Sequence, residues 1–249
     1  MFNTLISFFT GNHIRLNTRL AQQHIAAGAT LEGYVWIKNL TPKEILLKNI
    51  CIELATLYQH TANFQVDKEK YVIFKAQLRE KLVLNPSAIC EMPFEFTVPF
   101  FMPILPATAM VNTQITVPPL QIYEDNDEII ISPHPTIKAI FDIFWKLGFK
   151  HSPLSGYIER HATQPLQIFF LKPIKEPYLG KFKDIELFFD TDFEQTHVFM
   201  TINKMTKGLA GMEREEENDN KVQFSIKHTE NITTELLSHY LDATHRLLK

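Results

Sequence analysis

The chain has 249 residues, of which 45% are hydrophobic and 21% are charged, and its formal net charge is −3. A chain of this length can bury a sizeable core without disulfides or metals. The balance of 25 basic against 28 acidic residues excludes a global basic field for nucleic acid. The two cysteines, Cys51 and Cys90, form neither a disulfide framework nor a zinc-ligand pair, and they favour a reducing, cytoplasmic compartment.

The first eleven residues carry a short apolar stripe. Its members lie at helical spacing and predict a short amphipathic helix: Phe2, Leu5, Ile6 and Phe9. A helix of this length is not stable alone, so we expect it to dock on the rest of the protein, a second copy or a membrane. No Lys or Arg precedes Arg15, which favours docking on protein over docking on anionic lipid. We therefore take four side chains as partner-binding candidates: Phe2, Leu5, Phe8 and Phe9. The segment lacks a cationic start and a small-residue cleavage site, so we do not expect a secretory signal.

Residues 13–99 alternate between apolar and polar side chains along much of their length, which is typical of half-buried β-strands. The alternation is clear in five segments: 13–20, 30–38, 49–58, 72–84 and 92–99. No helical period separates them, so they predict an antiparallel β-sandwich. The stretch 121–135 looks like a boundary, because an acidic turn cluster is followed by Pro133 and Pro135, which stiffen the exit. We expect two domains, residues 1–131 and 132–249.

A helical period follows this boundary and predicts a helix at about 136–148, with Thr136 as its N-cap and Gly148 as its stop. The chain then returns to period two in four segments: 164–172, 182–191, 197–204 and 221–228. A second apolar stripe predicts a C-terminal helix at about 233–247. The fold class expected is all-β: two antiparallel β-sandwich domains with a short linker and helices in the C-terminal half.

The sequence contains no motif that points to an enzyme. Phosphate-binding glycine loops, the nucleophile elbow and the zinc-protease helix motif are all missing from it. The acidic stretches 124–128 and 213–219 lack the spacing of a calcium loop and are typical of solvated turns. His134, between two prolines, favours a structural role over a catalytic one. We expect no catalytic residues, no cofactor and no metal.

Two segments resemble the N-terminal sandwich of arrestin-like proteins: residues 26–38, where a turn glycine precedes a strand, and residues 93–103, with the pattern Pro-Phe-x-Phe-x-Val-Pro. Five further segments resemble the bacterial sporulation-control family usually called the stage-zero M proteins: the Phe-Phe pair at 8–9 and residues 17–20, 132–150, 182–189 and 202–212. This resemblance implies two arrestin-like domains without known catalytic residues. It also implies a cytoplasmic regulator that binds other proteins.

Three classes of function remain open at this point. The leading hypothesis is a non-enzymatic regulatory scaffold that offers sheet edges and inter-domain surface to other proteins, among them a second copy of the chain. The alternative is a peripheral membrane or trafficking-type adaptor that uses the apolar N-terminal segment. An enzyme or small-molecule binder is the third. Nucleic acid is not an expected partner.

Overall fold

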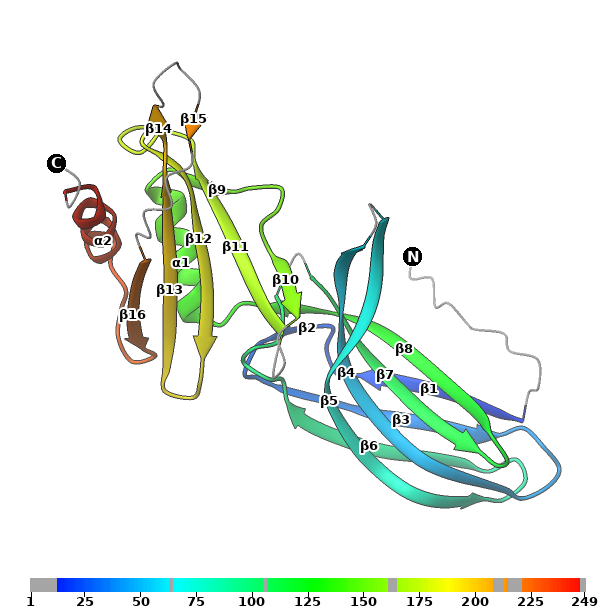
Figure 1. Ribbon diagram of the computed structural model, residues 1–249. Helices are drawn as coiled ribbons and strands as arrows, with labels where there is room; N and C mark the ends of the chain where they lie inside the picture. Colours follow the sequence, from blue (N-terminus) through cyan, green and yellow to red (C-terminus); the bar gives the residue numbers. More distant parts are fainter. Residues whose placement is uncertain are drawn as a thin grey trace.

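The computed structural model describes residues 13–62, 65–104, 107–160, 165–207, 213–214 and 221–246. Figure 1 shows that they fold into two parts, which follow one another along the chain. The first part holds eight strands: β1 (Ile14–Leu20), β2 (His24–Ala26), β3 (Thr30–Asn39), β4 (Ile45–Ala62), β5 (Gln65–Leu84), β6 (Ile89–Thr97), β7 (Thr108–Val117) and β8 (Gln121–Ser132).

These strands form two sheets that face each other. One has the order β1-β3-β6 and the other the order β2-β8-β7-β4-β5. Neighbouring strands are antiparallel except β2, which runs parallel to β8 over three residues. The alternation seen in the sequence sends one side of each strand inward, and Leu31, Val35 and Ile37 of β3 are 0% exposed. Opposite them, Leu47, Ile52 and Leu54 of β4 are equally buried, so the core lies between the two sheets.

In the described residues, the second part contains a six-stranded sheet, the two-stranded sheet β14-β15 and two helices. Its elements are α1 (Pro135–Lys146), β9 (Phe149–His151), β10 (Tyr157–Arg160), β11 (Pro165–Pro173), β12 (Phe182–Thr191), β13 (Gln195–Lys204), β14 (Thr206–Lys207), β15 (Glu213–Arg214), β16 (Lys221–Lys227) and α2 (Thr234–Arg246). The large sheet has the order β10-β11-β12-β13-β16, with β9 also paired to β11.

Both helices cover the same face of this sheet. Phe141 of α1 lies edge-on to Phe169 of β11, with ring centroids 5.0 Å apart. Tyr240 of α2 stacks on Phe224 of β16 at 4.5 Å. In the part of the chain that the structure describes, the second layer here is therefore helical, whereas the sequence analysis expected a second sheet. The broader prediction, an all-β fold with short helices in its C-terminal half, is confirmed.

The two ends of α1 test the predicted N-cap and the predicted stop of this helix. Gly148 has φ +89° and follows the C-cap residue Leu147, so the predicted helix stop is confirmed. The predicted N-cap, Thr136, is wrong. His134 is the cap, because its side chain accepts a hydrogen bond from the Thr136 N–H and Pro135 fills the first helical position, where no N–H is needed.

Two groups of predictions fall outside the described residues. Phe2, Leu5, Phe8 and Phe9 belong to residues 1–12, and most of the acidic stretch 213–219 lies in residues 215–220. Within the described ranges, neither helix is long and apolar enough to cross a bilayer.

Candidate interaction surface

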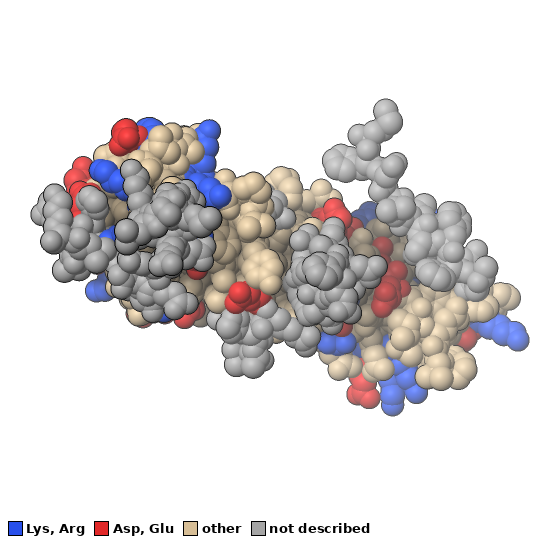
Figure 2. All heavy atoms as spheres, turned by 45° about the horizontal axis from the view of Figure 1, so that its top comes forward, with Lys and Arg blue, Asp and Glu red and all other residues tan. Residues whose placement is uncertain are grey.

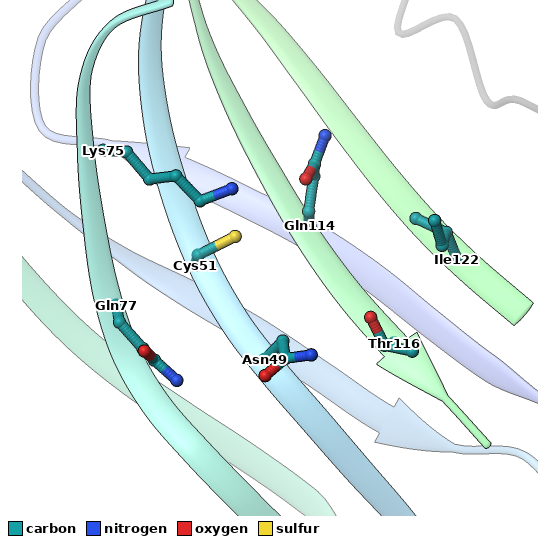
Figure 3. Close-up of a pocket in the computed structure, with 7 residues that line it drawn as sticks. All are labelled: Asn49, Cys51, Lys75, Gln77, Gln114, Thr116 and Ile122. Atoms are coloured by element: carbon teal, nitrogen blue, oxygen red, sulfur yellow. The ribbon is translucent and has the colours of Figure 1, made fainter. Parts of the chain in front are cut away.

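The five-stranded sheet of the first part has an outer face that points away from the core. In Figure 1 no described helix or strand lies over this face. It contains a hollow of about 300 Å³. Figure 3 shows the side chains that line it, which come from four neighbouring strands and are mostly polar: Asn49, Cys51, Lys75, Gln77, Gln114, Thr116 and Ile122.

A buried carboxylate next to the hollow ties three strands together. The Glu53 side chain on β4 is only 6% exposed, and its Oε1 accepts from Lys75 Nζ at 2.9 Å. Its Oε2 accepts from Lys70 Nζ and from Asn112 Nδ2, both at 3.0 Å. Burial alone would raise the pKa of Glu53, but these hydrogen bonds outweigh it and hold the pKa below its ordinary value. The sheet is therefore braced from β5 across β4 to β7.

Cys51 lies at the bottom of this hollow but does not have the environment of a nucleophile. Burial raises the pKa of its thiol, and the nearby Lys75 offsets only part of that effect. Lys75 cannot act as a base, because the hydrogen bond to Glu53 raises the pKa of its ammonium group. A thiol kept protonated is a poor nucleophile. The hollow thus offers hydrogen-bonding groups and shape, and no pair of groups for covalent chemistry.

Three cations extend the outer face beyond the hollow, and we call Lys48, Arg79 and Lys81 the basic strip. Lys48 on β4 and Lys81 on β5 are direct cross-strand partners, and Lys48 also lies opposite Thr116, a residue of the hollow. Arg79 lies two residues from Lys81 along β5, so these two side chains share a face, and both are exposed. Among the described residues, none of the three members of the strip forms an ion pair. Like charges directly opposite each other destabilise a sheet, so this strip favours an anionic group beside it.

The β8 side of the sheet is acidic on both faces. Glu124 and Glu128 are exposed, and Glu124 accepts a hydrogen bond from Gln114 at 2.8 Å. Asp125 and Asp127 alternate with them and point inward. Asp125 accepts a hydrogen bond from the Thr18 N–H of β1. Burial and the neighbouring Asp125 raise the pKa of Asp127 to about 6, and its Oδ2 atom is buried without a hydrogen-bond partner among the described residues.

The inward pair Asp125 and Asp127 lies beside two threonines and forms no metal site. Thr18 and Thr113 join their hydroxyls at 2.6 Å next to the pair. Across the described ranges, no group of three or more His, Cys, Asp or Glu side chains is arranged to hold a metal ion. In the view of Figure 2, acidic and basic side chains form separate small patches among the described residues, and neither sign covers the visible face.

No pattern in the sequence pointed to this surface. The candidates taken from the sequence, Phe2, Leu5, Phe8 and Phe9, lie outside the described residues. The signal that could have pointed here is Glu53, a single carboxylate inside the apolar run Ile50 to Leu54. Its partners could not be predicted, because irregularities at Ile50/Cys51 and Leu54/Ala55 shift the pairing of β4 with β5.

Comparison with known proteins identifies the family. The family model described as SpoOM protein matches residues 2–206 of the chain. The sporulation-control protein spo0M of Bacillus subtilis (strain 168) is 22% identical over 244 residues, which covers 92% of this chain and 94% of that protein. The crystal structure of Spo0M from Bacillus subtilis superposes with a TM-score of 0.75 at 18% identity, covering 95% of this chain and 98% of the other. The chain belongs to the SpoOM protein family.

Proposed function

We propose that this protein is a non-enzymatic regulator, of the sporulation-control type, which acts by binding other proteins. The observation that carries the proposal is the outer face of the five-stranded sheet, where a braced surface presents the basic strip beside a polar hollow, and where no described residue pairs with the strip or covers the face. A rigid surface of this kind loses little conformational entropy when a partner binds. The raised pKa values of Cys51 and Lys75 count against covalent chemistry in the hollow.

The partner expected from this chemistry is an acidic protein segment. Its carboxylates would neutralise Lys48, Arg79 and Lys81, and its backbone could add to the sheet. Among the described residues, β5 ends the strand order of the five-stranded sheet. An end strand of this kind presents backbone N–H and C=O groups to an added strand. Main-chain hydrogen bonds would supply affinity, and the basic strip would favour segments with negatively charged side chains.

Co-purification from the native host, quantified by mass spectrometry, tests this proposal. The variant Lys48→Glu with Lys81→Glu reverses the strip, while Lys172→Glu with Lys181→Glu makes the same charge change at exposed positions of the second part. A partner of the strip is recovered with the wild type and with the control variant, and is lost with the strip variant. If both variants retain every protein that the wild type recovers, the strip is not the binding surface.

The alternative is a peripheral membrane or trafficking-type adaptor that uses Phe2, Leu5, Phe8 and Phe9. Flotation with vesicles of neutral and anionic lipid separates the two functions. Binding to vesicles that is lost on deletion of residues 1–10 would support the membrane adaptor and would count against the protein-binding regulator.

We further propose that the protein has two domains, residues 1–131 and 132–249, of which the first is an arrestin-like β-sandwich, in a cytoplasmic setting. The support for the boundary is that β8 ends at Ser132 and that α1 begins the second part at Pro135. The two domains would meet at the segment Ser132–Pro135 and at the contacts described next.

A further inference from the structure

Four aromatic side chains from distant segments meet where the two parts of the molecule join, and we call them the junction cluster: Phe100, His134, Phe193 and His228. Phe100 follows β6, and Phe193 lies in the turn between β12 and β13; their ring centroids are 5.1 Å apart. Phe100 also lies edge-on to His134 at 6.0 Å. His134 in turn stacks on His228, which follows β16, with centroids 4.1 Å apart and planes inclined by 33°.

The hydrogen bonds of the two histidines suit neutral rings. His134 Nδ1 accepts from the Thr136 N–H at 3.3 Å, and a protonated Nδ1 would lose this helix cap. His228 Nε2 lies 3.2 Å from Thr196 Oγ1, and a hydroxyl can serve a neutral ring as donor or acceptor. Two imidazolium rings at 4.1 Å would repel each other, so the stack is stable when at least one ring is neutral.

The charged groups around the pair do little to favour protonation of His134. Asp192, in the same turn as Phe193, faces His228 and His197, and its Oδ1 also accepts from the Glu194 and Gln195 N–H groups. On α1, Lys138 forms an ion pair with Asp142. The segment 97–104 contains no charged side chain. Burial and the neighbouring His228 lower the pKa of His134.

We propose that the His134–His228 stack is a pH-sensitive latch between the two parts, closed when the rings are neutral and opened by proton uptake. A histidine whose pKa is lower in the closed state than in the open state takes up a proton when the latch opens. The latch is therefore fully closed above about pH 6.5, the ordinary histidine value, and weakens as the pH falls below it. Opening would also release the contacts of Phe100 and the hydrogen bonds that cross the junction from Gln167 to Ile104.

Amide hydrogen exchange at pH 7.5 and 5.5, corrected for intrinsic rates, tests the latch in the full chain. The reporters are the Ile104 and Thr136 amides, because Ile104 donates across the junction and Thr136 donates to His134. Each proton taken up raises the opening constant by at most about ten-fold per pH unit below pH 6.5, so we expect a rise of up to about ten-fold between these pH values. The amide of Ile202, a 1% exposed residue of β13, should not change.

A double variant of His134 and His228 can keep the helix cap and the ring contact while removing both groups that take up a proton. His134→Asn retains a strong N-cap, and His228→Phe retains the stacked ring. The double variant should open equally at both pH values, while the control His24→Gln, at an exposed histidine, should behave as the wild type. A wild-type opening constant that is the same at both pH values would overturn the proposal. If the double variant disturbs the junction at pH 7.5, the single variant His228→Phe decides: a reduced pH slope supports the latch, and an unchanged slope contradicts it.

Discussion

The side-chain amide of Gln167 pairs with the backbone of Ile104 as a neighbouring strand would. Gln167 Oε1 accepts from the Ile104 N–H at 2.8 Å, and its Nε2 donates to the Ile104 C=O at 2.7 Å. Gln167 belongs to β11 in the second part, and Ile104 is a 6% exposed residue of the first part. A single side chain therefore satisfies both backbone groups of a buried residue across the junction.

The variant Gln167→Leu should weaken the junction. It leaves the N–H and C=O of Ile104 buried without partners, and we expect the free energy of unfolding to fall by about 1–3 kcal/mol. Urea denaturation measures this loss, with faster exchange of the Ile104 amide as the local sign. Gln223→Leu, at an exposed position of β16, is the control and should change little. Equal stability of the Gln167 and Gln223 variants would contradict this role.

Gly28 should prove essential for the position of Phe100. Its φ is +85°, and a Cβ built there would lie 2.2 Å from a Phe100 ring carbon. Gly180 has a similar φ of +75° but open space around it, so Gly180→Ala reports the backbone cost alone, about 1 kcal/mol. Gly28→Ala adds the displacement of Phe100, for which we expect a further cost of about 1–3 kcal/mol. Thermal denaturation of the two variants compares them, and equal melting temperatures would refute the contact.

The protein should become more stable on mild acidification, because Asp127 then takes up a proton. Its pKa rises from 3.8 to about 6 in the folded state, so the folded protein binds the proton more tightly than the unfolded chain. The resulting loss of stability grows as the pH rises from about 4 to 6 and is complete above that range. Each unit of pKa corresponds to about 1.4 kcal/mol, and because Asp127 is partly exposed we expect Asp127→Asn to stabilise by about 1–2 kcal/mol at pH 7.5.

Urea denaturation at pH 4.5 and 7.5 checks this prediction for Asp127. The gain of Asp127→Asn over the wild type should fall to about a third at the lower pH. Asp190→Asn, at an exposed carboxylate of β12, should give no such gain at either pH. A stabilisation of Asp127→Asn that is the same at both pH values would mean that ionisation of Asp127 is not its cause.

Glu53 should show the opposite pH dependence. Its hydrogen bonds hold its pKa below 4.5, so the stability that it contributes is present above that pH and is lost as the pH falls through the folded-state value. Glu53→Gln should destabilise by about 1–2 kcal/mol at pH 7, since Lys70 and Lys75 lose a charged partner but can return to solvent. Glu128→Gln, an exposed change on β8, is the control. The prediction fails if both variants unfold at the same urea concentration.

The sequence predicted those features that depend on local periodicity. Alternation of side chains predicted the strands, and the spacing of Ile137, Ile140 and Phe144 predicted α1, because both patterns follow from which face of an element is buried. The N-cap was misassigned because Thr136 is a common cap type, whereas the fold uses His134.

The candidate sites could not be predicted from the sequence. The Glu53 network depends on two shifts in strand pairing, and the junction cluster depends on how the two parts meet. Neither leaves a periodic signal in the chain. The helical second layer of the second part was missed because α1 and α2 lie at opposite ends of that part of the sequence.

The most direct test of protein binding at the basic strip is a calorimetric titration with the purified partner that co-purification yields. The account predicts that the variant Lys48→Glu with Lys81→Glu weakens the Kd at least ten-fold, and that higher salt weakens wild-type binding, because the contacts involve exposed charges. The control Lys172→Glu with Lys181→Glu should bind as the wild type does. An equal Kd for the wild type and the strip variant would contradict the central claim.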